Sequence, residues 1–341
     1  MTRQFYLLIF ILPVAFFCNS CSNKLDLTAP WQDIPIVYGM VSVSDTATYI
    51  RVEKAFIDPA KSAQEIARIP DSLYYTDLTV QLIKNGNAYN LTKVDASKEG
   101  YTLQDGVFAS SPNYLYKISN KVLSLQADDN LTLKVVRSGA ILTQSTINVV
   151  GAYETLDGFP DFNPPYVNIS STASLSIGFR SDEKTAKFYD VALILHYTET
   201  DPKDPNKTVS KQLQWDVQKR VSRKNINGQP TPQIIVQRDQ SLDLFTFMAS
   251  AIPVVTGISR QFQTFDIQVG AGGQELLNYI NVGVANTGIT GSQSPPTYTN
   301  LSNGYGLFTS RNILLKQGYQ LNAASLDLLK SGNITKQLNF R

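Results

Sequence analysis

The first half of the chain is dominated by short runs in which hydrophobic and polar residues alternate. Such runs are typical of strands with one buried face, and they pair as predicted hairpins in residues 34–57, 78–94 and 131–150. The middle hairpin contains the strongest turn signal in the chain, Asn85-Gly86. Closely spaced turn signals of this kind predict an antiparallel, Ig-like β-sandwich over residues 32–150.

The second half begins with a different composition. Residues 151–168 are rich in Pro, Gly, Asp and Asn, which predicts an interdomain linker. Residues 169–341 are predicted to form a second, larger antiparallel sandwich. Its strand signals lie at 173–180, 187–197, 211–217 and 262–269.

Two helices and two irregular segments are predicted within this second sandwich. Hydrophobic residues at near-helical spacing predict short helices over 242–252 and 274–284. The stretch 200–208 is polar and contains two prolines, which predicts a loop. Gly270-Ala271-Gly272-Gly273 lacks the spacing of a dinucleotide-binding loop, so we interpret it as a turn and helix cap.

The N-terminus carries a single short apolar run. Residues 5–17 are too few to cross a bilayer, which takes about 20, but their number is typical of a signal peptide. The run leads to Ser20-Cys21, which resembles the lipobox of bacterial lipoproteins. The resemblance implies removal of residues 1–20, attachment of diacylglycerol to the Cys21 sulfur, and a lipidated tether over residues 21–31.

Two alternatives stay open at this end of the chain. Ordinary signal peptidase would leave Cys21 as a free thiol, without a lipid anchor. Lys24 and Asp26 match only in part the acidic residues that resemble a surface-export signal in Bacteroidota lipoproteins. From this partial match, our hypothesis is display on the outer face of the outer membrane, and the alternative is periplasmic display.

Composition narrows the chemistry further. Charged residues make up 17%, below the usual ~25%, and the formal net charge is only +2, which gives no reason to expect nucleic-acid binding. Cys18 and Cys21 are the only cysteines. If the first is lost with the signal and the second is lipidated, the mature chain has no disulfide, thiol nucleophile or thiolate metal site, and no cofactor is predicted.

Candidate catalytic and metal-binding residues are few. His196 is the only histidine, and we interpret it as a packing or hydrogen-bonding residue because a hydrolytic triad or a zinc site needs more partners. Acids and amides gather in the stretches 157–163 and 201–206. Neither has the spacing of an EF-hand loop, so turn chemistry is the expected explanation and calcium binding stays open.

One motif near the end carries a family resemblance. The segment that starts at Asn300 fits an Asn-Ile-x-x-Gly-x-Gly-x-Phe pattern, and the matching residues are Asn300, Leu301, Gly304, Gly306 and Phe308. With the lipobox and the two-part β layout, it resembles the Bacteroidota lipoproteins classed as domain of unknown function 4249. The resemblance implies an outer-membrane lipoprotein, often encoded beside TonB-dependent receptors, with no established activity. We interpret the five residues as structural.

These observations predict a lipid-anchored, non-catalytic accessory protein of the outer membrane. Its membrane contact would be the lipid on Cys21, and its partner a TonB-dependent receptor or another outer-membrane β-barrel. The alternative is a glycan- or nutrient-binding lipoprotein that serves such a transporter, and an enzyme ranks third. Candidate aromatic residues for glycan binding are Trp31, Phe159, Phe162, Tyr166 and Trp215.

Overall fold

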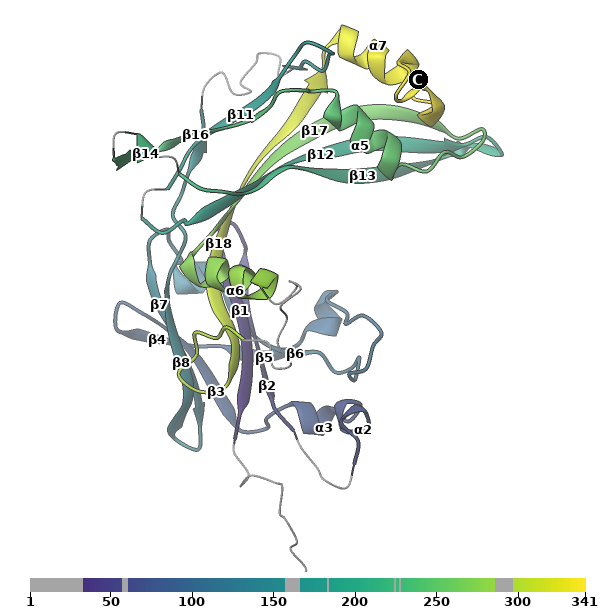
Figure 1. Cartoon of the computed structure of the whole chain (residues 1–341). Helices are drawn as coiled ribbons and strands as arrows, with labels where there is room; N and C mark the ends of the chain where they lie inside the picture. Colours follow the sequence, from purple (N-terminus) through teal and green to yellow (C-terminus); the bar gives the residue numbers. More distant parts are fainter. Residues whose placement is uncertain are drawn as a thin grey trace, which may run out of the picture.

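Two β-sandwich halves are joined by one continuous strand (Figure 1). The computed structural model describes residues 33–56, 61–156, 166–182, 184–223, 225–226, 228–285 and 297–341. The predicted signal peptide, Cys21 and its tether lie outside these described residues, as does the segment 157–165. The mainly β fold and its division into sandwiches were predicted from the sequence, and the structure confirms them.

The N-terminal half packs two sheets face to face. One sheet contains β1 (Pro35–Val41), β2 (Ala47–Lys54), β6 (Tyr114–Ser119), β5 (Thr92–Asp95) and the first part of β18 (Tyr305–Leu321). The other contains β4 (Asn87–Asn90), β3 (Leu78–Lys84), β7 (Asn130–Arg137) and β8 (Ala140–Asn148). Short helices lie between these strands along the chain: α2 (Ala63–Ala67), α3 (Pro70–Leu73), η1 (Ala96–Glu99) and α4 (Asn120–Leu123).

The three predicted hairpins are confirmed as the pairs β1–β2, β3–β4 and β7–β8. The alternating sequence explains their placement, because every second residue points into the space between the sheets. In β1, Val37 and Val41 are buried, whereas Tyr38 and Met40 are exposed. The resulting core draws on both sheets and includes Phe308, from the far end of the chain.

The C-terminal half is built on one long sheet. Its strands are β13 (Asp204–Val221), β12 (Phe188–Asp201), β17 (Ser259–Gly272) and the second part of β18, with β10 (Tyr166–Val167) beside the end of β18. A smaller sheet of β16 (Gln233–Arg238), β11 (Leu175–Arg180) and β9 (Glu154–Thr155) packs against it. The remaining elements are β14 (Asn225–Ile226), β15 (Gln229–Pro230), α5 (Asp243–Ala251), α6 (Gln274–Ala285), α7 (Ala323–Ser331) and η2 (Lys336–Leu338).

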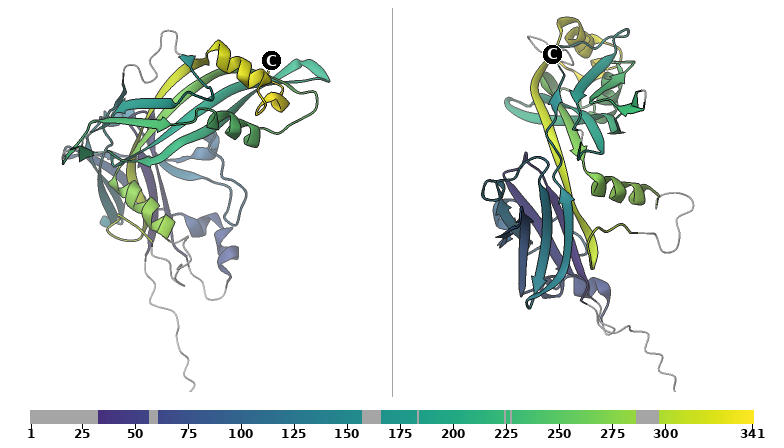
Figure 2. Two further views of the ribbon diagram at one scale, coloured as in Figure 1. Left: turned by 45° about the horizontal axis from the view of Figure 1, so that its top comes forward. Right: turned by 90° about the vertical axis from the view of Figure 1, so that its left-hand side faces the viewer.

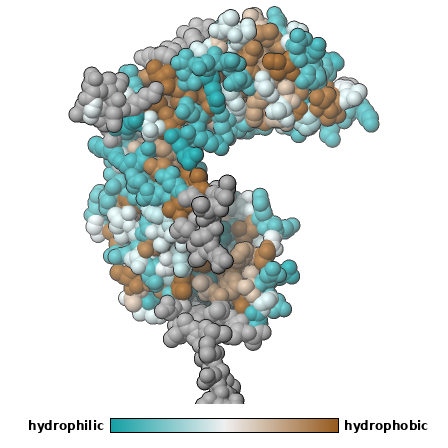
Figure 3. All heavy atoms as spheres, viewed as in Figure 1, coloured by the Kyte–Doolittle hydropathy of each residue, from teal (hydrophilic) through white to brown (hydrophobic). Residues whose placement is uncertain are grey.

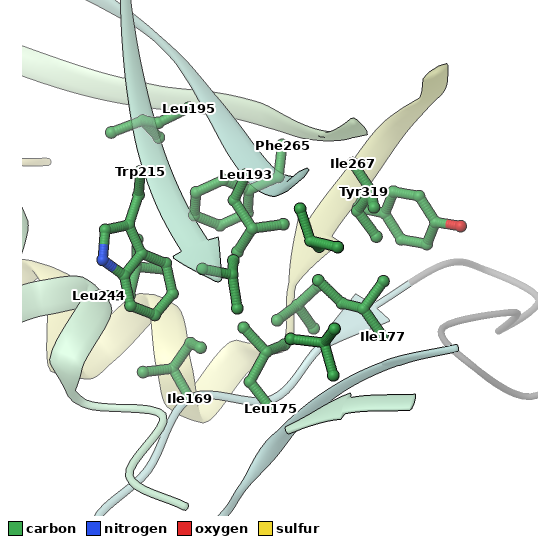
Figure 4. Packing of buried hydrophobic residues seen from close by; sticks show 14 of the residues in the cluster. Ile169, Leu175, Ile177, Leu193, Leu195, Trp215, Leu244, Phe265, Ile267 and Tyr319 are labelled. Atoms are coloured by element: carbon green, nitrogen blue, oxygen red, sulfur yellow. The ribbon is translucent and has the colours of Figure 1, made fainter. Parts of the chain in front are cut away.

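Only one face of the long sheet is covered by the C-terminal core. Leu193, Phe265 and Ile267 on this face pack against Ile177 of the smaller sheet and Leu244 of α5 (Figure 4). The alternate residues of β12, β13 and β17 point to the opposite face and are largely polar, for example Asp190, Gln214 and Gln268. The long sheet therefore has an apolar, covered face and a polar, open face.

Strand β18 runs through both halves, as the right-hand view of Figure 2 shows. Residues 305–310 pair in parallel with β1, and residues 311–319 pair antiparallel with β17. The sequence-based boundaries placed all of 169–341 in the second sandwich, and this needs correction, because Leu301 and Phe308 belong to the N-terminal core. A parallel partner so distant in the sequence leaves no local turn signal that could reveal it.

Hydrogen bonds fasten the two halves at the waist, the region where β18 crosses between them. The Asn312 side chain donates to the Gly151 carbonyl (2.9 Å), and Val150 N–H donates to Ser310 Oγ (2.8 Å). The Tyr153 hydroxyl donates to the Asn312 carbonyl (2.9 Å). Residues 151–156 and 166–168, predicted as linker, instead contribute these contacts and the strands β9 and β10.

Of the other local predictions, those of the helices are confirmed and those of the loop and the glycine turn are wrong. Both predicted helices are confirmed as α5 and α6. The predicted loop at 200–208 is wrong, because β12 and β13 stay paired out to Thr200–Thr208 and turn at Pro202-Lys203. The glycine run is likewise not a turn, because Gly270 and Gly272 lie within β17 and only Gly273 precedes α6. Among the described helices none is long and apolar enough to span a membrane.

Candidate functional site

The five family-motif residues fasten the start of β18 to β1. The Asn300 side chain donates to the Phe308 carbonyl (2.6 Å) and accepts from Phe308 N–H (3.0 Å). Gly306 has φ +126°, and a Cβ there would lie 1.8 Å from the Val37 carbonyl oxygen. Gly304 is similarly placed at φ +86°, and the Leu301 and Phe308 side chains are buried. These contacts hold two strands together, and none of the five residues lines either cavity described below.

Two of the cavities among the described residues lie next to the waist. The larger, which we name the Tyr49 pocket, has a volume of about 810 Å³ and lies on the outer face of β2 and β6. The smaller, the Asp216 pocket, has about 300 Å³ and lies between the open face of the long sheet and α6. Arg311 of β18 lines both cavities.

The Tyr49 pocket is shaped by the alternation of β2. Ile50 and Val52 point into the core, so Tyr49 and Arg51 point outward to form the floor. Tyr101, in the loop after η1, forms a wall, and its ring centroid is 5.4 Å from that of Tyr49, with the planes at 59°. The pocket thus presents two adjacent aromatic rings among polar groups.

Its two arginines differ in how far they are paired. Arg51 donates to Glu53 (3.0 Å) and to Asn113 (2.9 Å), which occupies much of its guanidinium. Arg311 is 3.8 Å from Asp45 Oδ2, and within the described residues its Nε has no hydrogen-bond partner. Arg311 is therefore the cation of the pocket that is freer to bind an anion.

The edge of this pocket is fixed by a small polar network. The Tyr49 hydroxyl donates to Glu99 (2.7 Å), and Lys117 Nζ lies 2.8 Å from the same carboxylate oxygen. The hydrogen bond from Lys117, followed by that from Tyr49, lowers the pKa of Glu99. Glu99 thus stays ionised and holds the Tyr49 hydroxyl, so that Tyr49 offers its ring rather than its hydroxyl to the cavity.

The Asp216 pocket is more self-contained. Asp216 Oδ2 lies 2.7 Å from Lys219 Nζ, and Asp216 Oδ1 accepts from Gln214 (2.9 Å). Burial acts to raise the pKa of Asp216, but these two partners outweigh it and lower the pKa overall. The Asp216 carboxylate is thus satisfied within the pocket, whose volume is less than half that of the Tyr49 pocket.

His196 lies on the same open face of the long sheet. Its Nε2 is 2.8 Å from Asp266 Oδ2, and Asp266 Oδ1 also accepts from Gly318 N–H (3.1 Å). Asp266 is 5% exposed, so this hydrogen bonding satisfies a buried carboxylate. The geometry is that of a hydrogen-bonding residue in a sheet, as the sequence interpretation of His196 proposed.

The candidate calcium stretches give no metal site in the part of the chain that the structure describes. That part contains no group of three or more His, Cys, Asp or Glu side chains able to hold an ion. In the 201–206 stretch, Asp201 Oδ1 accepts from Lys203 N–H (2.9 Å), which is ordinary turn chemistry. Residues 157–163 lie outside the described residues.

The aromatic residues singled out from the sequence do not form a binding site together. Trp215 is 7% exposed and stacks on Phe247 in the C-terminal core. Tyr166 is exposed at β10, distant in the fold from the Tyr49 pocket. Trp31, Phe159 and Phe162 lie outside the described residues.

A third feature is the distal end of the C-terminal half, which we name the tip. Here β12 and β13 turn, and among the described strands β13 pairs only with β12. Val209, Val254 and Val255 are 43%, 62% and 50% exposed at this end. Figure 3 shows hydrophobic surface gathered over the neighbouring α5 side.

The tip is held rigidly despite its exposure. Arg260 is 2% exposed and binds Glu199 (2.8 Å), the Leu338 carbonyl (2.7 Å) and the Pro253 carbonyl (2.8 Å). These bonds fix the segment that carries Val254 and Val255 against β12. The exposed valines are thus presented on an ordered surface.

The sequence did not reveal the Tyr49 pocket. Alternation in β2 does place Tyr49 and Arg51 on the polar face, and that signal was available. Tyr101 and Arg311, however, reach the pocket from a loop and from the last long strand, which no local pattern connects with β2.

Comparison with known proteins assigns no family to the chain. No protein-family model matches it, and no curated protein matches it. A solved structure described as CBD12 from CALX1.2 is 8% identical, covering 84% of this chain and 99% of that one, with a TM-score of 0.18. The calcium binding domain CBD12 of CALX1.1 is 9% identical over the same shares, with a TM-score of 0.15. TM-scores this low carry no argument about the function of this chain.

Proposed function

We propose that this protein is an outer-membrane lipoprotein, anchored by lipid on Cys21, that acts as a non-catalytic interaction partner of an outer-membrane β-barrel such as a TonB-dependent receptor. The signal-peptide pattern that ends at Cys21 and the resemblance carried by the Asn300–Phe308 segment support the anchor and the compartment. The tip of the C-terminal half supports the interaction role.

The observation that carries the proposal is the outer edge of β13, with which no described strand pairs. Over 206–212 every residue of this strand is exposed, so its outward backbone groups are available to a partner strand. An edge of this kind can accept a strand of another protein, which extends the sheet. Lys207 and Lys211 lie in the same stretch, and lysines on an edge discourage unselective pairing.

The exposed valines add affinity to that edge. Val209 shares the side of β13 that packs on α5, and Val254 and Val255 follow α5 in a loop whose Gly257 lies beside Pro202 of the β12–β13 turn. Exposed apolar groups beside an open edge favour a protein partner over a small ligand.

The start of β1 and the tip lie toward opposite ends of the molecule. In Figure 1 β1 starts at the lower end, whereas β12 and β13 turn at the upper right. About ten tether residues after Cys21 reach at most about 35 Å, so the start of β1 would stay within that distance of the membrane surface. A partner that is itself embedded in the outer membrane fits this geometry.

A pull-down from detergent-solubilised membranes tests the proposal with the full-length, lipidated chain. Wild-type protein is expected to recover an outer-membrane β-barrel, and a Val209→Glu, Val254→Glu, Val255→Glu triple variant is expected to lose it. Val122→Glu is the matched control, because Val122 is 64% exposed on α4, in the other half. Equal recovery by the triple variant would contradict the role of the tip, and an unmodified Cys21 in the mature protein would contradict the anchor.

A second role is favoured by the Tyr49 pocket, namely capture of a nutrient such as a glycan for such a transporter. A concave cavity that combines aromatic rings with a few convergent polar groups is typical of a ligand site. Binding of any saccharide that Tyr101→Ala weakens would support this role.

A further inference from the structure

We infer that the Tyr49 pocket binds a short acidic oligosaccharide, with a ligand carboxylate on Arg311 and a sugar ring against Tyr49 and Tyr101. The inference rests on the second role proposed above and adds the chemical class of the ligand and the residues that recognise it. Four features of the pocket carry it.

The first feature is size. At about 810 Å³ the cavity lies in the upper part of the range found for ligand sites, roughly 300–1,000 Å³. That volume suits a ligand of several rings rather than an inorganic ion or a single small acid.

The second feature is the exposed aromatic surface. Tyr101 is 55% exposed, although its ring stands beside that of Tyr49 at the wall of the cavity. An aromatic ring offers a broad apolar face with a polar rim, which matches the C–H face and hydroxyl edge of a sugar ring. Leu103 and Leu115 add apolar lining nearby.

The third feature is the charge at the upper wall. Arg51 is already bonded to Glu53, whereas the Arg311 Nη2 atom makes only a long contact of 3.8 Å to Asp45, and its Nε is buried and has no partner among the described residues. Arg311 and Asp45 are 42% and 40% exposed, and ion pairs between side chains this exposed are weak. A ligand carboxylate can therefore compete for Arg311, which is suited to bidentate binding of carboxylates.

The fourth feature is that the walls are fixed before a ligand arrives. Asn113 is 2% exposed, donates to the Tyr101 carbonyl (2.7 Å) and accepts from Arg51. Tyr101 N–H also donates to the Ala96 carbonyl (3.0 Å). Because this loop is already ordered, binding costs less conformational entropy.

Calorimetric titration of the full-length protein in detergent tests the inference, with trigalacturonic acid and its fully methyl-esterified form as probes. The acid form is expected to bind at least about tenfold more tightly, and its affinity should fall as salt is raised. Arg311→Gln is expected to remove this preference, Tyr101→Ala to weaken both probes, and Asp45→Asn to strengthen the acid form by removing its competitor.

Arg68→Gln, an exposed arginine remote from the pocket, is the matched control and should bind as wild type. Equal binding of both probes with no effect of Arg311→Gln would overturn the acidic class, while leaving a glycan-binding role in place. Binding of neither probe would overturn the inference, and if a panel of neutral glycans also failed, the second role would fall with it. Binding that Tyr101→Ala does not alter would place the ligand elsewhere and also overturn the inference.

Discussion

Strands β18 and β13 are nearly equal in length, at 17 and 18 residues, but they are used in opposite ways. β18 crosses both halves and pairs in turn with β1, β17 and β10, whereas among the described strands β13 pairs only with β12. Residues 306–310 of β18 are all buried, whereas residues 206–212 of β13 are all exposed. One strand is specialised for holding the fold, and the other is available for contacts with other molecules.

The difference between β18 and β13 predicts where substitutions should be tolerated. Along residues 306–310 of β18, close backbone approach and buried side chains leave no room for change, so stability should depend on this stretch. The tip of β13 has little packing to lose. A substitution there that changes the function of the protein would therefore have to act through binding.

The largest expected effect is at the closest contact of β18. Gly306→Val would place a Cβ 1.8 Å from the Val37 carbonyl oxygen, at a φ of +126°. We expect a loss of more than about 4 kcal/mol in the free energy of unfolding, which belongs to the exceptional range for one substitution. Urea unfolding followed by circular dichroism measures it.

Gly139→Ala is the control for this prediction, because Gly139 also has a positive φ, +80°, but a Cβ there meets nothing within 4 Å. Its cost should be about 1–2 kcal/mol of backbone strain. Equal urea midpoints for the two variants would show that the β1–β18 contact is not as close as described.

A somewhat smaller loss is expected from Phe308→Ala. Phe308 is fully buried in the N-terminal core, and large-to-small changes of this kind cost about 3–5 kcal/mol. Tyr305→Ala in the same strand removes a side chain that is 52% exposed and should change stability by no more than about 0.5 kcal/mol. If both variants unfold alike, the start of β18 does not belong to the N-terminal core.

The waist should show a pH-dependent effect. Asp182 is 7% exposed and accepts hydrogen bonds from Thr185 and from the N–H groups of Lys184 and Ala186. Burial acts to raise its pKa, but these hydrogen bonds outweigh burial, and the pKa is lowered overall. Asp182→Asn should therefore cost about 1–3 kcal/mol at pH 7.

The sign of the pH dependence follows from the lowered pKa. The stabilising contribution of Asp182 is fully present above the ordinary carboxyl pKa, near about 4, and is lost as pH falls through the lower folded-state pKa. Thermal unfolding of wild type and Asp182→Asn should differ most at neutral pH and converge in strong acid. A difference that grows toward acid pH would contradict this account of Asp182.

Local structure was well predicted from the sequence, because hairpins and helices depend on neighbouring residues. Asn85-Gly86 specifies its own turn, at φ values of +50° and +78°, and the β3–β4 hairpin follows. The role of β18 was not predicted, since its pairing with β1 joins opposite ends of the chain. The Tyr49 pocket was not predicted for the same reason, because its floor, its wall and its arginine come from three segments that are distant in the sequence.

The length of β12 and β13 was missed for a different reason. Two prolines and several charged residues in 200–208 are typical of a loop. An edge strand also tolerates such residues, because one side of its backbone needs no partner. The features that concealed the strand from sequence reasoning are thus those of an open edge.

The smallest stability change is expected at the tip. The Val209, Val254, Val255 triple variant should alter the free energy of unfolding little, by about 0.5 kcal/mol or less per site, because these side chains are exposed. Loss of partner recovery with unchanged unfolding would separate binding from folding.

Site-specific photo-crosslinking in intact membranes tests the central claim most directly. With a photoreactive residue at position 254, we predict a crosslink to an outer-membrane β-barrel protein, and with the same residue at position 122, on the exposed face of α4, we predict none. The absence of any crosslink from position 254, or the same crosslinked protein from both positions, would contradict the assignment of the tip as the partner-binding surface.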